Sequence, residues 1–248
     1  MVRRQTYTVK ALLCATMLIT PIVCAQQHTK LNIEFPHPLI TEVLFAVPTG
    51  LEGDANRDGV RDATGDEYVE IVNPHDKPIS LKGYEISDWN AQFEESDAGW
   101  IVKLPDLTLE PGERAIIFNG LHQKWDGPVG DPAVAPKAKN EALGDAYVIN
   151  SQNTSNYVGL NNTRDCVVLK DTGGTMIHVI AWEDAGKKKD DDKGIIESLT
   201  IPASCFVETI KPVRRQSVER KHRDSPLVPH GDRDGLPCSP GQWPAPAK

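Results

Sequence analysis

Apolar and polar positions alternate in short runs along the middle of the chain. Each run has a period near two, which is typical of a β-strand, because successive side chains of a strand point to opposite faces of its sheet. The runs occupy residues 39–45, 67–72, 79–81, 84–89, 107–109, 114–118, 157–160, 166–170 and 176–182. Gly, Pro, Asn and Asp separate them, and no amphipathic helical period lasts more than about two turns. The pattern therefore predicts an all-β protein with the architecture of a β-sandwich.

Three polar insertions interrupt these runs. Residues 91–99 are acidic, residues 121–144 are rich in Pro, Gly, Ala and Lys, and residues 183–194 set three lysines against three aspartates. We expect all three to be long loops. The second has the composition of a mobile flap, and the third that of a solvated hairpin tip.

The N-terminus has the pattern of a cleavable export signal. Arg3, Arg4 and Lys10 precede an apolar run, residues 11–25, that is too short to span a bilayer and ends in small residues. We expect cleavage after Ala25, with a buried N-terminal helix as the alternative. No later segment of the sequence is apolar enough to cross a membrane. The sequence thus predicts an exported protein that is periplasmic, at the cell surface or secreted.

The predicted domain plan follows from these boundaries. Residues 1–25 are the signal peptide, residues 26–37 a polar linker, residues 38–223 one sandwich domain, and residues 224–248 a loosely ordered tail rich in Pro and Gly. The roughly 220 residues that remain after cleavage are enough for one sandwich with long loops, or for two small domains.

Charge and cysteine content narrow the classes of partner. Cleavage removes three of the 27 basic residues and none of the 35 acidic ones, which leaves a mature net charge of −11. Nucleic acid is an unfavourable partner for such a chain, because phosphate neutralisation needs a positive face. Cys166, Cys205 and Cys238 remain after cleavage, and an oxidising compartment favours one pair. Since Cys166 opens a strand, we expect a Cys205–Cys238 disulfide.

An acidic loop precedes the second strand. Asp54, Asn56 and Asp58 lie at alternate positions, and Gly59 permits a tight turn after them. Short carboxylate and amide side chains at this spacing converge on a hard cation such as Ca²⁺. The expected ligands are Asp54, Asn56, Asp58, Val60 through its carbonyl, Asp62 and Asp66. Gly65 stands where an EF-hand has its bidentate glutamate, so the loop is no true EF-hand, and a solvated acidic turn remains the alternative.

The sequence lacks the common hydrolase motifs. It contains neither a GxSxG nucleophile elbow nor an HExxH zinc motif. His178 is expected to be a surface histidine of a strand rather than a catalytic base. A carbohydrate platform built on Trp100 and Trp125, which flank insertions, is the alternative to ordinary packing of these tryptophans.

A basic cluster follows the last of these runs. It consists of Lys211, Arg214, Arg215, Arg220, Lys221, His222 and Arg223. Residues 216–220 within it fit an edge strand whose charges prevent sheets from pairing with one another. Because Glu208, Glu219 and Asp224 are interspersed, anion binding is the alternative and not the first interpretation.

Six segments occur in an order that belongs to a known family. They are ITEVLF, DEYVEIVNP, ISLKGYEISD, LEPGERAIIF, VGLNNTRDCVVLKDTGGTMIHVIAW and QSVER, spread over about residues 39–219. In this order they resemble the lamin tail domain family, which is also common in exported bacterial proteins. The resemblance implies an immunoglobulin-like β-sandwich that works in recognition or scaffolding, with no catalytic constellation to carry over. The insertions and the Asp54 loop depart from the family pattern and enlarge its loops.

These observations lead to one functional hypothesis and two alternatives. The hypothesis is an exported, non-catalytic binding or scaffolding module, with a calcium-stabilised loop, that recognises another surface or secreted component. The alternatives are an exported hydrolase whose site is assembled from the long loops, and an envelope protein that associates with itself. The identity of the partner is not encoded in any motif of the sequence.

Overall fold

The computed structural model describes residues 33–93, 99–120, 127–155, 157–184, 193–231 and 236–242. The predicted signal peptide, most of the polar linker and Trp125 lie outside these ranges, as do parts of the three insertions and the last six residues.

Regular structure in these ranges is almost entirely β. The strands are β1 (Leu39–Leu44), β2 (Tyr68–Val72), β3 (Ile79–Ser80), β4 (Glu85–Ser87), β5 (Ile101–Lys103), β6 (Thr108–Leu109), β7 (Arg114–Phe118), β8 (Tyr147–Asn150), β9 (Arg164–Lys170), β10 (Met176–Glu183), β11 (Phe206–Ile210), β12 (Val218–Arg220) and β13 (Leu227–Pro229). The helical turns are η1 (Leu51–Gly53), η2 (Asn90–Gln92), η3 (Glu141–Leu143) and α1 (Ile195–Ser198).

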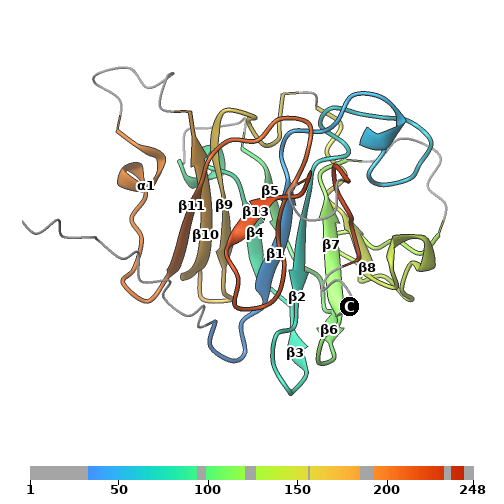
Figure 1. Cartoon of the computed structure of the whole chain (residues 1–248). Helices are drawn as coiled ribbons and strands as arrows, with labels where there is room; N and C mark the ends of the chain where they lie inside the picture. The colour runs from blue at the N-terminus through green and yellow to red at the C-terminus, as the bar shows by residue number, and fades with distance from the viewer. Residues whose placement is uncertain are drawn as a thin grey trace, which may run out of the picture. The chain divides into compact units, whose positions relative to one another are not determined.

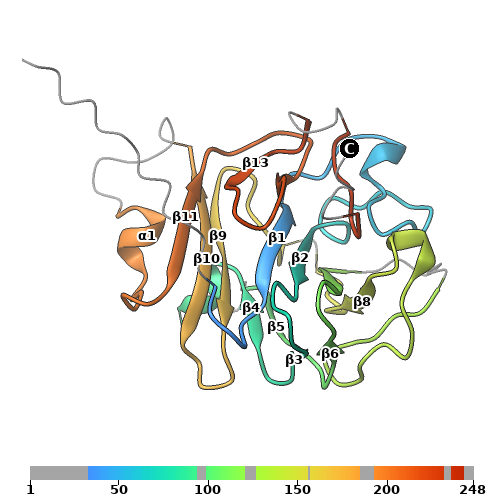
Figure 2. The ribbon, with the colours of Figure 1, turned by 60° about the horizontal axis from the view of Figure 1, so that its bottom comes forward.

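The strands form two large sheets and one small one. One large sheet has six strands in the order β13-β12-β1-β2-β7-β8, and the other has five in the order β11-β10-β9-β4-β5. β3 and β6 form the small sheet. Figures 1 and 2 show the two large sheets as the layers of a sandwich, with α1 beside β10 and β11. The predicted all-β sandwich is therefore confirmed.

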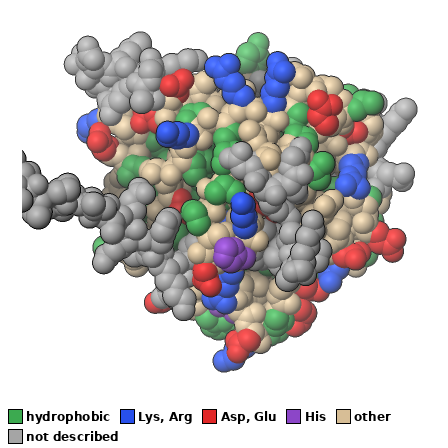
Figure 3. Space-filling view, viewed as in Figure 1, with side chains coloured by type: hydrophobic (Ala, Val, Ile, Leu, Met, Phe, Trp, Pro, Cys, Tyr) green, Lys and Arg blue, Asp and Glu red, His purple; other side chains and the backbone are tan. Residues whose placement is uncertain are grey.

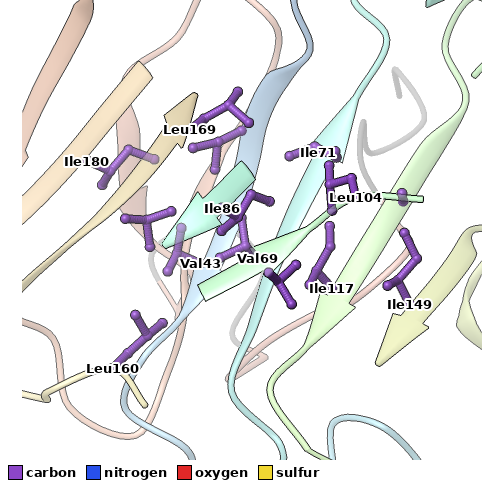
Figure 4. Packing of buried hydrophobic residues seen from close by; sticks show 14 of the residues in the cluster. Val43, Val69, Ile71, Ile86, Leu104, Ile117, Ile149, Leu160, Leu169 and Ile180 are labelled. Atoms are coloured by element: carbon purple, nitrogen blue, oxygen red, sulfur yellow. The ribbon is translucent and has the colours of Figure 1, made fainter. Parts of the chain in front are cut away.

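The core lies between the two sheets, where each strand presents alternate side chains. Val43, Val69 and Ile117 come from the six-stranded sheet, and Leu169 and Ile180 from the five-stranded one, and all five are fully buried. Figure 4 shows these side chains converging between the layers. Full burial of each aliphatic side chain stabilises the fold by about 1.5–3 kcal/mol, so the periodicity of the strands accounts for the sandwich.

The outer face of the six-stranded sheet is covered as well. Leu44, Tyr68, Ile116, Phe118 and Val148 project from that face into a second buried cluster. Three loops cover it, through Ala55 of the acidic loop, through Leu143 and Ala146 near η3, and through Cys238. These loops form a third layer over one sheet.

This third layer corrects two expectations about flexible segments. The insertion at residues 121–144 has the composition of a flap, yet its described part packs on the sheet through Leu143. The segment after residue 223, expected to be loosely ordered, contributes β13, and residues 236–242 (the C-terminal segment below) pack against the same sheet. Both segments are held by buried contacts that their polar composition does not reveal.

The expected strand assignments fail at two places. Residues 157–160 form a turn and not a strand. Residues 216–220 were expected to provide an edge strand, but β12 pairs with β1 on one side and with β13 on the other. Its second neighbour comes from the Pro-rich stretch, which has no recognisable strand periodicity.

Two glycines allow the C-terminal segment to pack closely against the insertion at residues 121–144. A Cβ on Gly241 would lie 1.7 Å from the carbonyl oxygen of Leu143, and a Cβ on Gly144 would lie 2.0 Å from the carbonyl oxygen of Gly241. Both glycines have positive φ, +82° and +64° respectively. Only glycine permits this close approach of two backbones.

We expect Gly241→Ala to lower the free energy of unfolding by roughly 2 kcal/mol more than Gly174→Ala. Gly174 is a matched control, because its φ of +81° carries the same backbone strain while no atom lies within 4 Å of the place that its Cβ would take. Urea unfolding of both variants measures the difference. Equal losses would mean that the contact between Gly241 and Leu143 is not formed.

Candidate functional site

The acidic loop is closed by hydrogen bonds between its carboxylates and its own backbone. Asp54 accepts the N–H of Asp58 at 3.1 Å and the N–H of Gly59 at 3.0 Å. Asp66 accepts the N–H of Asn56 at 3.0 Å through one oxygen and that of Asp62 at 2.6 Å through the other. Asp66 therefore ties both halves of the loop together, and Gly59 makes the turn with φ of +86°.

The structure brings most of the predicted ligands into this one loop. Asn56, Asp58 and Asp66 are buried, Asp54 and Asp62 are half-buried, and Val60 is exposed. Burial raises the pKa of Asp66 to about 7, and the nearby charges of Asp54 and Asp58 add to this effect. The loop thus concentrates negative charge against a buried carboxyl group.

The loop is also fastened to the segment that follows β1. The Arg61 guanidinium donates to the carbonyl of Pro48 at 2.8 Å and to that of Val47 at 3.1 Å. Gly53 lies so close to the Pro48 carbonyl that a Cβ would be 2.2 Å from that oxygen. The position of residues 47–49 therefore depends on the fold of the acidic loop.

A groove of about 690 Å³ lies beside this segment, at one end of the sandwich. It is lined by residues after β1 and β11, by the end of β10 and the residue that follows it, and by the residues before β9. The apolar part of its lining consists of Ala46, Val47 and Val213, which are largely buried residues. Its positive charge comes from the exposed side chains of Lys211, Arg214 and Arg215. Concave sites with an apolar lining and a few polar groups are the usual form of ligand-binding sites.

The charges along the groove are not balanced by its acids. The lining contains two acids, Glu183 and Asp184, against three basic residues, and Glu183 is already paired with Arg164 at 2.9 Å. Lys211, Arg214 and Arg215 form no ion pair with any described residue. Arg215 moreover has a φ of +56°, a conformation that costs a non-glycine residue about 1–2 kcal/mol. The basic wall of the groove is therefore available to a ligand.

The basic cluster of the sequence is divided by the fold. Lys211, Arg214 and Arg215 line the groove, whereas Arg220 is fully buried between the sheets. Lys221, His222 and Arg223 are exposed in the turn between β12 and β13. Acidic and basic side chains are also interspersed over the face of the molecule drawn in Figure 3. Of this cluster, only Lys211, Arg214 and Arg215 lie in a concave surface that suits an anionic ligand.

The prediction that His178 lies at the surface is wrong. His178 is fully buried, and its Nε2 lies 3.1 Å from Glu208 Oε2. Arg220 donates to both carboxylate oxygens of Glu208 and, through Nε, to the Ile40 carbonyl at 2.9 Å. This triad joins β10 and β11 of one sheet to β12 of the other, so the histidine is buried because it completes a link between the layers.

Protonation states in the triad follow from its surroundings. Burial lowers the pKa of His178, which favours the neutral imidazole. Burial alone would raise the pKa of Glu208, but the hydrogen bond from His178 and the Arg220 guanidinium hold it below its usual value. The triad is thus an ionised Glu–Arg pair with a neutral histidine, and it is a structural link.

The expected Cys205–Cys238 disulfide is not formed. Both thiols are free, and so is that of Cys166. Cys205 packs with Cys166 against the outer face of the five-stranded sheet, whereas Cys238 packs in the third layer over the other sheet. The two cysteines therefore belong to different hydrophobic clusters.

Trp100 does not provide a carbohydrate platform. It is 2% exposed, and its indole N–H donates to Ser151 Oγ at 2.9 Å. Trp125, the other tryptophan considered for that role, lies outside the described residues.

Sequence reasoning missed three buried acids near the groove, Glu67, Asp88 and Asp165. Glu67 Oε2 accepts the N–H of Leu160 at 2.9 Å, and Asp165 accepts those of Trp89 at 2.9 Å and Asn161 at 2.7 Å. These bonds hold the turn that leads to Asn162 and Thr163 in the groove wall. Glu67 and Asp88 lie within predicted strands and Asp165 lies directly before one, but the burial of these acids was not visible in the sequence.

Their pKa values are raised by burial. Burial raises the pKa of Asp165 to about 7, with a further contribution from the charge of Asp88. Burial also raises the pKa of Asp88 to about 6, and its Oδ2 is buried without a hydrogen-bond partner. The pKa of Glu67 is shifted in the same direction and for the same first reason.

Comparison with known proteins identifies one similarity. A family model described as Lamin Tail Domain matches residues 50–184, which is more than half of the chain. The match runs from the segment before η1 to the end of β10 and includes the acidic loop and part of the groove. A comparison with curated proteins finds no match. Among the described residues, no helix has the length and apolar character that would let it span a bilayer.

We expect the free energy of unfolding to fall between pH 5 and pH 8. The folded pKa values of Asp165 and Asp88 lie above the ordinary aspartate value of 3.8. In this window the native state therefore keeps protons that the unfolded state has released. The stability they provide is complete below pH ~4 and is lost as the pH rises through about 6 and 7, by on the order of 1–3 kcal/mol.

Asp88→Asn should reduce this loss, because it removes one titrating group and its repulsion of ionised Asp165. Urea unfolding at pH 5 and pH 8 in excess chelator measures the change. Asp76→Asn, an exposed acid in the turn after β2, serves as the control and should keep the wild-type pH dependence. An unchanged pH dependence in Asp88→Asn would contradict the role assigned to the buried acids.

Proposed function

This chain belongs to the lamin tail domain family, and from that premise we propose that it is an exported, non-catalytic binding module. The family consists of immunoglobulin-like domains that serve as protein-interaction modules. The proposed ligand is an acidic segment of another surface or secreted protein, bound in the groove at the end of the sandwich.

The groove carries this proposal. Its lining combines apolar surface from Val47 and Val213 with three exposed basic side chains that have no acidic partner in the described structure. Complementary charge attracts and orients an acidic ligand, while apolar contact provides affinity. An acidic peptide segment that also carries apolar side chains supplies both kinds of group.

The composition of the groove favours binding over hydrolysis. Its identified lining residues include no histidine, serine or cysteine. A Ser–His or Cys–His nucleophile of the usual kind is therefore not present among these lining residues. His178 and His230, by contrast, are fully buried away from the groove lining.

Export is proposed from the N-terminal sequence. The positive residues before an apolar run that ends at Ala25 are the support for it, and this region lies outside the described residues. An exported location gives the module access to surface and secreted partners.

Calcium binding by the acidic loop is proposed as the support of the groove wall. The alternation of Asp54, Asn56 and Asp58, the turn at Gly59 and the burial of Asp66 beside two other carboxylates favour a divalent cation there. A cation would relieve the repulsion among these carboxylates. Because Arg61 ties the loop to residues 47–49, calcium would also stiffen one side of the groove.

Charge reversal in the groove should abolish partner binding. We expect Lys211→Glu/Arg214→Glu to lose at least about tenfold in affinity, since each reversal replaces attraction by repulsion. The measurement is affinity capture from secreted and envelope fractions by tagged protein, followed by titration of the captured partner and competition with oligo-glutamate. Lys103→Glu/Lys137→Glu, which changes the same net charge at exposed positions outside the groove, should bind like the wild type. Equal binding by both double variants would exclude the groove.

Calcium should raise the melting temperature of the wild type, and Asp54→Asn should reduce that increment. Asp54→Asn removes a ligand charge while it keeps one oxygen for the loop hydrogen bonds. Asp131→Asn is the matched control, because Asp131 also caps a turn, accepting the N–H groups of Ala133 and Val134 at 2.8 Å, outside the acidic loop. Thermal unfolding in calcium and in chelator gives the increments. The calcium proposal fails if Asp54→Asn keeps the full increment.

A further inference from the structure

Three glutamates lie side by side on the outer face of the six-stranded sheet. Glu219 of β12 is the direct partner of Glu42 of β1, and Glu42 is in turn the partner of Glu70 of β2. All three are fully buried. Like charges directly opposite one another destabilise a sheet, so this row needs compensation.

Hydrogen-bond donors of the protein satisfy these carboxylates only in part. Glu42 Oε1 accepts from Ser217 Oγ at 2.5 Å and from the N–H of Ser239 at 3.1 Å. Glu70 accepts from Thr41 Oγ1 at 2.8 Å and from the N–H of Gly241 at 2.7 Å. Glu42 Oε2, however, is buried without a hydrogen-bond partner.

The Tyr68 hydroxyl does not satisfy this oxygen with a well-formed hydrogen bond. Tyr68 is close enough to Glu42 for each to affect the other's pKa, but the Tyr68 hydroxyl oxygen is also buried without a hydrogen bond of acceptable geometry. An orphaned carboxylate oxygen beside a second carboxylate is the arrangement expected where a cation belongs.

His230 supplies the third ligand of such a site. Its Nε2 lies 3.0 Å from Glu219 Oε2 and 3.9 Å from Glu42 Oε1. One ligand atom from each of the three residues lies within 4.8 Å of the other two. Two ligands of a tetrahedral zinc ion, each about 2.0–2.1 Å from the metal, are about 3.3 Å apart, and the measured separations bracket that value.

The orientation of the imidazole fits metal binding. His230 Nδ1 lies 2.9 Å from the carbonyl oxygen of Leu236, so this nitrogen carries the proton and Nε2 faces the carboxylates. A histidine that binds a metal ordinarily donates its other N–H to such an oxygen. Ser239 Oγ also lies 2.7 Å from Nε2 and would turn away from it, or join the ligands, when an ion binds.

We propose that Glu42, Glu219 and His230 bind a divalent transition-metal ion of the zinc class. One imidazole nitrogen with two carboxylates suits zinc, whereas calcium and magnesium prefer oxygen ligands alone. The ion balances two carboxylate charges and fastens β13 and the C-terminal segment to β1. The acidic loop and the groove have no part in this site.

The test is zinc retention by the full chain. Because the site is buried, the protein is unfolded in guanidinium with chelator, refolded with Zn²⁺ alone and freed of loose metal by gel filtration. We expect about one zinc per chain by elemental analysis, falling at least fivefold in His230→Gln. His222→Gln, which changes an exposed histidine of the β12–β13 turn, and Asp54→Asn of the acidic loop should both retain the wild-type amount.

A second measurement decides the matter if His230→Gln fails to fold. Crystals of the wild type grown after refolding with Zn²⁺ should show an anomalous scattering peak within bonding distance of His230 Nε2. The proposal is overturned if the refolded wild type retains no zinc, if His230→Gln retains the wild-type amount, or if the peak lies elsewhere. Absence of zinc would identify the centre as a protonated His230 held between two glutamates.

Discussion

Burial of Glu42, Glu70 and Glu219 on adjacent strands is the constraint on which the rest of the structure depends. Burial, and after it the charges of neighbouring glutamates, raises the pKa of Glu42 to about 7 and that of Glu70 to about 8. Carboxyl groups in such a place must find donors. Besides Thr41 of β1, the donors are Ser217, Ser239 and Gly241 from the last part of the described chain, so the C-terminal segment folds back over the sheet. The third layer exists because the row of glutamates requires a cover.

The groove depends on a second set of buried polar contacts. Arg220 holds β10 and β11 against β12 through Glu208, and thereby fixes the segment that leads to Lys211 and Arg214. Glu67 and Asp165 hold the facing turn. The apolar core aligns the sheets, but these ionisable groups determine where the loops at the open end lie. A binding surface made of loops is precise only when such contacts fix its walls.

The extent to which the sequence predicts the structure differs from residue to residue. A period of two shows that Glu42 and Glu70 face away from Val43 and Val69, and the six family segments place the strands that carry them. Periodicity does not show whether a third layer covers the second face, so burial of the glutamates, His178 and Arg220 was missed. The partner strand of β12 was missed for a related reason, since β13 lies in a stretch whose prolines suggest a loop. The acidic loop was recognisable because its spacing is local, whereas the groove joins segments more than 160 residues apart.

The pairing of β1 with β12 also bears on the order in which the chain acquires its structure. Glu42 finds its neighbour Glu219 only after a further 177 residues have been made, which at about 5–20 residues per second takes roughly 10–35 seconds. During that interval β1 has one of its two neighbours missing, and Glu42 is still in water. Contacts so distant in sequence also close slowly. Synthesis therefore delivers an incompletely folded polypeptide, which a protease can cut, until the end of the sheet arrives to close it.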